Sequence, residues 1–295
     1  MALELGEHPN YRVLERLQER KEYESPDGRK LSTGLIADCE TTGLKLNRSK
    51  VIEVGLLRFE FDPQTGKIYR LLDEYGEFED PGEALSPEIV ELTHITDAMV
   101  AGKAIDDARV EQLLEGVDLV IAHNASFDRP FFERRFPVFE EVAWACSLEQ
   151  VPWSQEGITT RKLEFLAYRY GFFFDGHRAI NDCRALLELL ARPTPKSGRL
   201  PLQILLAPLT QRDWTARALN SSFDKKELLK ARGYFWDSER KFWHTTVTGD
   251  EKIKEEVAWL KEAIYGGREV ELEFEIHQPL HRFSQRPGKV LRRPI

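Results

Sequence analysis

The sequence has few of the features expected of a membrane-embedded or exported protein. Its 295 residues include only three cysteines, Cys39, Cys146 and Cys183. This odd number, without the spacing of a disulfide framework, favours a reduced, cytoplasmic protein. No run approaches the ~18 uncharged apolar residues of a membrane span, so we predict no membrane contact. The first seven residues contain two glutamates and no basic residue, so we expect no secretory signal there.

The overall composition is that of a globular protein. Hydrophobic residues make up 41% and aromatic residues 11% of the chain, which is enough for a core and excludes wholesale disorder. The length predicts one large domain or two smaller ones. The net charge of −8 argues weakly against a protein that coats nucleic acid through bulk positive charge.

The charge is divided unevenly along the chain. Residues 1–195 carry 23 basic and 36 acidic side chains, whereas residues 196–295 carry 19 basic and 14 acidic ones. The change falls in a stretch rich in proline, at 193–201, which cannot continue a helix or a central strand. We therefore predict a linker over 193–201. The other predicted parts are an N-terminal helical extension at 1–30, a main domain at 31–192, a small accessory domain at 202–276 and a basic tail at 277–295.

The apolar pattern of the first half predicts an α/β domain. Residues 10–22 have helical spacing, which is the basis for the N-terminal helix. Strands are predicted at 34–38, 51–61, 67–79, 118–122 and 141–146, and helices at 86–92, 106–114, 128–135, 162–170 and 178–191. Three early strands followed by alternating helices and strands are typical of a mixed sheet covered by helices.

Two carboxylates end the first strand of this domain. Asp38 and Glu40 are two residues apart, so their side chains lie on the same side of the backbone. Such a like-charged pair is unfavourable unless a cation neutralises it. Hard oxygen ligands of this kind suit Mg²⁺ or Mn²⁺. The alternative is a solvated acidic turn.

Three short blocks carry a family resemblance. They are IADCETTGL at 36–44, VIAHNASFD at 120–128 and GHRAINDC at 176–183. In this order they resemble the three exonuclease motifs of the DEDDh, or DnaQ-like, 3′–5′ exonucleases, a group that includes the proofreading subunits of bacterial replicases. LTHIT at 92–96 is similar to the segment that connects the first two motifs. The resemblance covers most of residues 33–192 and implies a ribonuclease H-like, mixed five-stranded sheet flanked by helices.

The resemblance also implies a chemistry. It predicts a metal-dependent 3′–5′ exonuclease that releases nucleoside 5′-monophosphates from single-stranded or frayed DNA ends. Two Mg²⁺ or Mn²⁺ ions would be held by the four acids, with Asp38 bridging them, Glu40 and Asp182 completing the site of the ion that activates water, and Asp128 holding the other. His177 would be the general base, because an unperturbed histidine accepts a proton near cellular pH.

Each of these residues has a purely structural alternative. His177 could be a surface loop residue, Asp182 a helix decoration and Asp128 an N-cap. Cys39 and Cys183 flank metal ligands, but thiolate is a poor partner for Mg²⁺, so we expect both to be buried apolar residues.

The resemblance implies substrate contacts as well. Thr41 or Thr42 would bond near the terminal 3′ hydroxyl, and Leu44 would wedge against the last base. Asn124 and Phe127 would lie near the single strand, although Phe127 could belong to the core. His123 is equally compatible with a structural role.

The second half predicts a small α+β domain with a possible nucleic-acid surface. Part of it, 232–243, is similar to a small module appended to DNA-processing proteins. Aromatic side chains between cations could stack bases and hold phosphates; these residues are Lys226, Lys230, Arg232, Trp236 and Trp243. The alternatives are core packing or protein docking. Residues 203–206 faintly resemble a sliding-clamp peptide, but a buried strand explains them.

Three functions remain open. The first is a DNA exonuclease, in a proofreading, replication or repair setting, whose C-terminal domain docks on a polymerase or another DNA-processing protein. The second is an RNA-trimming exonuclease, because both nucleic acids present the same 3′ end chemistry. The third is a non-catalytic nucleic-acid-binding or docking subunit, against which the complete set of four acids and one histidine argues.

Overall fold

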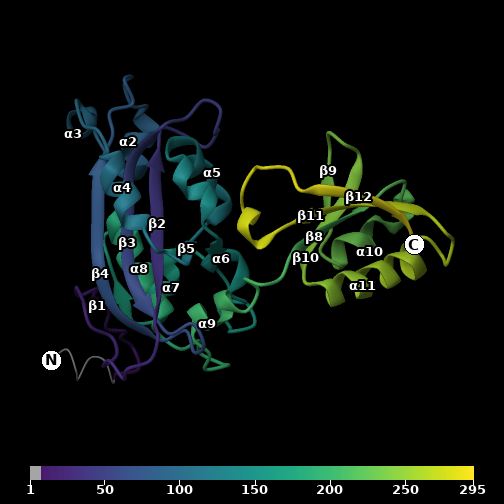
Figure 1. Cartoon of the computed structure of the whole chain (residues 1–295), viewed down its shortest axis with the longest axis horizontal. Coiled ribbons are helices and arrows are strands. Elements are labelled where there is room, and N and C mark those ends of the chain that lie inside the picture. The colour runs from purple at the N-terminus through teal and green to yellow at the C-terminus, as the bar shows by residue number, and fades with distance from the viewer. Residues whose placement is uncertain (1–7) are drawn as a thin grey trace. The chain divides into compact units, whose positions relative to one another are not determined.

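The computed structural model describes residues 8–295 and divides into two compact units (Figure 1). One unit ends at Ala207 and the other runs from Pro208 to Ile295. Each unit is built on its own five-stranded sheet. Within residues 8–295, no helix combines the length and the apolar character that crossing a membrane requires.

The sheet of the first unit has the strand order β4-β3-β2-β5-β6. Its strands are β2 (Ser32–Thr41), β3 (Val51–Phe61), β4 (Ile68–Phe78), β5 (Leu119–Ala122) and β6 (Trp144–Cys146). The strands β2, β3 and β4 are antiparallel, whereas β5 and β6 run parallel to β2. All four residues of β5 are buried, as expected for a parallel strand covered on both faces. The predicted mixed five-stranded sheet is confirmed.

The first unit also contains eight helices within its described residues. They are α2 (Pro87–Thr93), α3 (Asp97–Val100), α4 (Asp107–Leu114), α5 (Ala125–Arg135), α6 (Ser147–Gln150), α7 (Leu163–Arg169), α8 (Ala179–Leu190) and α9 (Pro201–Leu206). A 3₁₀ turn spans Pro137–Glu141. Of these, α8 contacts β2, β3 and β4, and α5 contacts β2, β5 and β6. The helices α5 and α8, which are distant from each other in the sequence, therefore both contact the same strand, β2.

A glycine allows α8 to approach the sheet. A Cβ atom on Gly55 of β3 would lie 2.3 Å from the backbone carbonyl carbon of Ala179, which is far below any real contact. The thiol of Cys183 donates a hydrogen bond of 3.3 Å to the Gly55 carbonyl. Gly55 therefore sets the height of the first turn of α8 above the middle of β3.

The N-terminal helix predicted over 10–22 is wrong. This segment is extended, and β1 (Glu15–Arg16) pairs in parallel with β7 (Phe172–Phe173). The amide of Leu17 donates to the carbonyl of Phe173 at 2.8 Å. A short isolated helix is marginal in water, and the exposed backbone of β7 offers the segment better hydrogen-bond partners.

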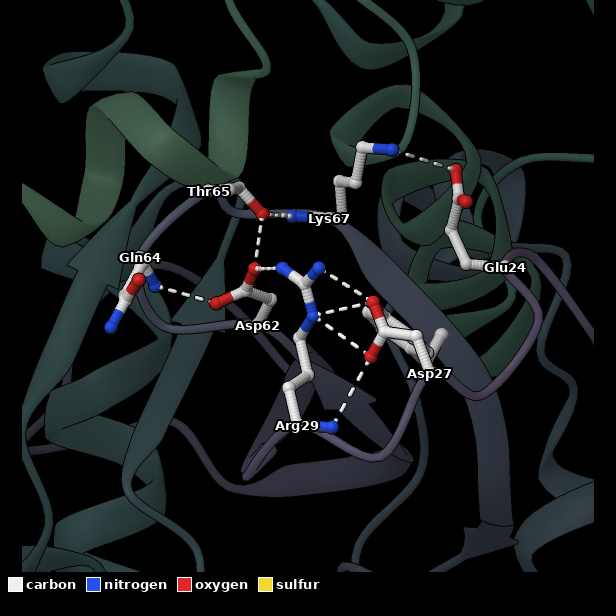
Figure 2. Close-up of polar contacts among 8 residues, drawn as sticks. Glu24, Asp27, Arg29, Asp62, Gln64, Thr65 and Lys67 are labelled. Atoms are coloured by element: carbon white, nitrogen blue, oxygen red, sulfur yellow. Dashed lines mark hydrogen bonds and ion pairs between the residues drawn. The ribbon is translucent and has the colours of Figure 1, made fainter.

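Polar contacts fasten the turn that contains Asp27 and Arg29 to the β3–β4 hairpin (Figure 2). Arg29 lies between Asp27 and Asp62, and its Nη1 is 2.5 Å from Asp62 Oδ2. Asp62 is buried and also accepts hydrogen bonds from the amide of Gln64 and the hydroxyl of Thr65. The segment before β2 is thus tied to the tip of the hairpin.

The proline-rich stretch at 193–201 is held against the first unit. Glu156 accepts hydrogen bonds from the amides of Lys196 and Ser197, at 2.8 and 3.0 Å. The strand expected at 203–206 is also wrong, because Pro201 opens helix α9, which contacts α6, α8 and β6. The division between the units accordingly falls after Ala207 and not within the predicted linker.

The second unit is a small α+β domain, as predicted. Its elements are β8 (Asp213–Ala218), α10 (Lys226–Ala231), β9 (Phe235–Asp237), β10 (Phe242–Thr248), α11 (Asp250–Trp259), β11 (Glu271–His277) and β12 (Lys289–Pro294), with short helical turns at Phe223–Lys225, Leu260–Ile264 and Pro279–His281. The sheet order is β12-β11-β8-β10-β9, and all pairs are antiparallel. Apolar residues of α10 and α11 join the sheet in one core.

The predicted basic tail is part of this sheet. Strand β12 pairs with β11, and Phe274 lies opposite Leu291. Glu273 of β11 lies opposite Arg292 of β12 and accepts a hydrogen bond of 2.9 Å from it. Opposite charges across neighbouring strands stabilise such pairing, so Arg292 of the tail contributes to the sheet.

Candidate active site

A cleft of about 560 Å³ brings the three sequence blocks together. The residues that line it are Asp38, Cys39, Glu40, His123, Asn124, Phe127, Asp128, Leu148, Thr160, Arg161, Lys162, Leu163, Glu164, His177 and Asp182. They come from β2, from the start of α5, from α6, from the segment leading into α7 and the start of that helix, and from the turn and first residues of α8. All four predicted acids and the predicted base are among them.

The first two acids follow from strand geometry. Asp38 and Glu40 both reach the cleft from β2, while Cys39 between them is buried. Asp38, Glu40 and Asp182 can each place a carboxylate oxygen within 4.8 Å of the others. The predicted same-side pair is therefore present and joined by an acid from α8.

Asp128 is held by the strand that carries the first two acids. It is 3% exposed, and its Oδ1 accepts the amide of Cys39 at 3.2 Å. Helix α5 begins at Ala125 with Asn124 as its N-cap residue, so the N-cap alternative for Asp128 is wrong. The hydrogen bond fixes the carboxylate of α5 against β2.

His177 and Asp182 are positioned by the turn that begins α8. The His177 backbone has a φ of 60°, a conformation that is uncommon outside glycine. Asp182 accepts the amide of Arg178 at 3.2 Å, which closes this turn. The imidazole Nε2 of His177 lies 3.7 Å from a carboxylate oxygen of Glu164, and both side chains are about half exposed.

The acids raise one another's pKa. Burial, reinforced by Asp128 and then Asp182, holds the pKa of Asp38 well above its usual range. Burial and the neighbouring acids raise the pKa of Glu40 to about 8. Burial likewise raises the pKa values of Asp128 and Asp182 to about 7. Four carboxylates gathered in one cleft do not all ionise readily at neutral pH unless cations neutralise them, and their hard oxygen donors fit divalent ions.

Sequence reasoning missed Glu53. This residue of β3 lies opposite Glu40 in the β2–β3 register and is almost fully buried. Its two carboxylate oxygens accept from Arg178 Nε at 3.0 Å and from the amide of Ala179 at 3.2 Å. Glu53 thereby anchors the residues that directly follow His177. A single acid within the apolar first part of β3, residues 51–57, was the available signal.

The predicted substrate residues are placed in two groups. Asn124 and Phe127 line the cleft, and the Phe127 ring packs 5.0 Å from that of Phe131. Thr41, Thr42 and Leu44 are not among the lining residues. Thr41 donates its hydroxyl to the Gly43 carbonyl, Thr42 accepts the amide of Lys50, and Leu44 is 83% exposed.

His123 has a structural role. Its Nε2 lies 2.7 Å from the carbonyl oxygen of Arg161, and its Nδ1 lies 2.7 Å from the hydroxyl of Ser147. Burial lowers the pKa of His123 to about 4, so the ring is neutral. A carbonyl only accepts, so Nε2 donates and Nδ1 accepts from Ser147.

The accessory residues of the second unit are only partly brought together. The rings of Trp236 and Trp243 lie 5.5 Å apart, and Trp236 is 47% exposed. Lys230 pairs with Glu227 at 3.2 Å, and Arg232 pairs with Glu256 at 3.1 Å. Lys226 lies over the ring of Phe223. Trp236 is therefore available, while Trp243 packs partly against the core of the unit, and Lys230 and Arg232 already have acidic partners.

Comparisons with known proteins point to one family. The exonuclease family model RNase_T matches residues 35–190. The DNA polymerase III PolC-type proteins of Clostridium perfringens and Staphylococcus aureus are 28% identical over 162 residues and 32% identical over 167 residues. These matches cover 53% and 52% of this chain, and 11% of each polymerase, so the chain spans about a tenth of the length of these curated relatives.

Two solved structures are similar to part of the chain. Exonuclease X in complex with 5′ overhanging duplex DNA is 24% identical, with a TM-score of 0.38, over 58% of this chain and 97% of that one. Exonuclease I of E. coli in complex with a 5cy-dA13 oligonucleotide is 16% identical, with a TM-score of 0.44, over 64% of this chain and 48% of that one.

Proposed function

This chain belongs to the exonuclease family, and from that premise we propose that it removes nucleotides one at a time from the 3′ end of DNA, releasing nucleoside 5′-monophosphates. The observation that carries the proposal is the convergence of four carboxylates and a histidine in one cleft. Single-stranded or frayed ends are the proposed substrate, because an open end can enter the cleft as an unpaired strand.

We assign the four acids to metal binding. Asp38, Glu40 and Asp182 lie close enough to share an ion, and Asp128, held against β2, would take part in a second site. Two Mg²⁺ or Mn²⁺ ions bound here would lower the pKa of the attacking water and stabilise charge on the leaving oxygen. The raised pKa values of the acids support this assignment, because they show how strongly the cluster favours added positive charge.

We assign the general base to His177. Its imidazole would take the proton of the attacking water. Glu164, with a carboxylate oxygen 3.7 Å from Nε2, would help to orient the ring. Glu53 would hold the following backbone through Arg178 and Ala179, which limits how far the imidazole can drift.

The relatives favour DNA over RNA as the substrate. Both curated relatives named above are DNA polymerases, although they are much longer than this chain. A polymerase or another DNA-processing protein is therefore the proposed partner of the second unit, and Trp236 with Trp243 its proposed base-stacking surface. A cytoplasmic location remains a prediction from the cysteine content.

The test is digestion of a 5′-labelled single-stranded DNA by the full chain with Mg²⁺ or Mn²⁺. A ladder that shortens by one nucleotide at a time supports a 3′–5′ exonuclease, whereas immediate release of the label indicates the opposite polarity. A matching RNA oligonucleotide ranks the two substrates.

The matched variants are Asp38→Ala, in the cleft, and Glu111→Ala, an exposed acid on α4. We expect the first to lose activity and the second to retain it. Equal activity of the wild type and Asp38→Ala would refute the proposed site, and no activity in either protein would favour a binding subunit.

A further inference from the structure

We propose, resting on the nuclease function above, that Arg161 and Lys162 form a phosphate-binding site for the substrate strand. This site would hold a phosphodiester next to the scissile one. The two residues line the same cleft as the acids, and they are the lining residues with a permanent positive charge. Neither belongs to the three sequence blocks that carry the family resemblance.

The position of these cations follows from the segment that leads into α7. Arg161 and Lys162 directly precede Leu163, where α7 begins, and both side chains are exposed. A guanidinium nitrogen of Arg161 donates to the carbonyl of Leu148 at 3.2 Å, and Leu148 also lines the cleft. This bond uses one of the five donors of the guanidinium and leaves others for a ligand.

His123 pins this segment to the cleft. Its Nε2–H donates to the Arg161 carbonyl at 2.7 Å, and its other nitrogen accepts from Ser147, which is fully buried on α6. The backbone between the two cations is thus fastened to the rigid centre of the unit. A preorganised cation loses less conformational freedom on binding than one on a free loop.

The charge of the cleft explains why a strand needs these cations. The scissile phosphate is served by the carboxylate cluster and the ions it holds. Each further phosphate of the strand brings another negative charge beside the same acids. Arg161 and Lys162 offset that repulsion at the neighbouring phosphate without entering the chemistry. They therefore predict an effect on substrate binding rather than on the hydrolytic step.

The experiment compares Lys162→Met in the full chain with the wild type on two substrates. The first is a dT oligonucleotide; the second is thymidine 5′-p-nitrophenyl phosphate, which has a single phosphodiester and no neighbour. We expect KM for the oligonucleotide to rise about tenfold with kcat unchanged, and the salt dependence of KM to weaken by ~0.7 in log–log slope. Hydrolysis of the nitrophenyl ester should stay within about twofold of the wild type, because its only phosphate lies at the acids.

A modified substrate and a control variant sharpen the comparison. A neutral methylphosphonate at the linkage next to the scissile one should raise KM for the wild type and have little further effect on Lys162→Met. Lys103→Ala, which removes an exposed cation outside the cleft, should match the wild type throughout. An equal loss on both substrates would mean a structural role and overturn the inference, as would an unchanged KM for the oligonucleotide.

Equilibrium binding separates this inference from the proposed function. Labelled dT oligonucleotide is titrated with Asp38→Ala and with Asp38→Ala combined with Lys162→Met. A higher Kd in the double variant supports the phosphate site, even if the wild type hydrolyses nothing. Absence of hydrolysis by the wild type would refute only the nuclease proposal. Equal Kd values overturn the phosphate site, whatever the activity.

Discussion

Replacing Glu40 by glutamine tests the electrostatics of the cleft directly. Glutamine keeps the size of the side chain and removes one negative charge from the cluster. We expect Glu40→Gln to destroy nuclease activity yet to stabilise the metal-free protein at alkaline pH. At alkaline pH Glu40 is ionised in both the unfolded and the native state. Water solvates this charge in the unfolded chain, whereas burial and the neighbouring acids oppose it in the native cleft.

The size and sign of this effect on the free energy of unfolding follow from the pKa of Glu40, which rises from 4.5 to about 8 on folding. Below pH 4.5 the group is protonated in both states and contributes nothing. Between pH 4.5 and about 8 the native state binds the extra proton, so stability falls as the pH rises. At roughly 1.4 kcal/mol per pKa unit, the full cost is on the order of 3–5 kcal/mol. Glu40 titrates together with the other carboxylates of the cleft, so removing its charge recovers only part of this cost. We therefore expect Glu40→Gln to raise the free energy of unfolding by about 2 kcal/mol.

The assay is thermal unfolding of the wild type and Glu40→Gln in EDTA at pH 5.5 and pH 8. A gain of about 2 kcal/mol should raise the Tm of the first unit by ~4–8 °C at pH 8 and by much less at pH 5.5. With saturating Mn²⁺ the order should reverse, because the wild type gains more from the ion. A lower Tm for the variant at pH 8 in EDTA, or a difference that does not depend on pH, would refute the reasoning.

Three further predictions concern the supports of the site and the second unit. Gly55→Ala should lower the free energy of unfolding by about 1–3 kcal/mol, because its Cβ would meet Ala179; unchanged denaturant midpoints would contradict the close approach. Glu53→Gln should lower kcat about tenfold at constant KM, because it loosens the backbone after His177; an unaltered kcat in steady-state assays would remove Glu53 from the positioning of the base. Trp236→Ala, in an Asp38→Ala background that cannot degrade DNA, should weaken binding of a single-stranded oligonucleotide about tenfold in fluorescence anisotropy; equal Kd values would leave the tryptophan pair as packing.

The sheet could be predicted from local patterns, and the cleft from the three motif blocks that carry the family resemblance. Apolar runs locate β2, β3 and β5, and the end of each motif strand or the start of each motif helix carries the acid. Asp38 and Glu40 lie on the same side of β2 because side chains alternate with a period of two residues in any strand. Parallel pairing of β5 with β2 then places the block after β5 beside them.

The remaining features depend on contacts distant in sequence. Residues 10–22 have a helical pattern, but their partner is β7, about 160 positions later, and pairing with it decides their conformation. The short apolar run at 203–206 fits a strand or a helix equally well, and Pro201 decides for the helix. Glu53 looks like an interruption of β3 until α8 brings Arg178 onto it.

The three native cysteines suit this chain to site-specific labelling. All are buried: Cys39 between the two acids of β2 and against Asp128, Cys183 against Gly55, and Cys146 at the end of β6. Burial also raises the pKa of Cys146 to about 11 and that of the other two thiols well above the usual range. Reagents attack the thiolate, so maleimides should leave the folded protein unmodified. A single cysteine placed on the rim of the cleft would then carry the only fluorophore, and strand entry could be followed without first deleting any native thiol.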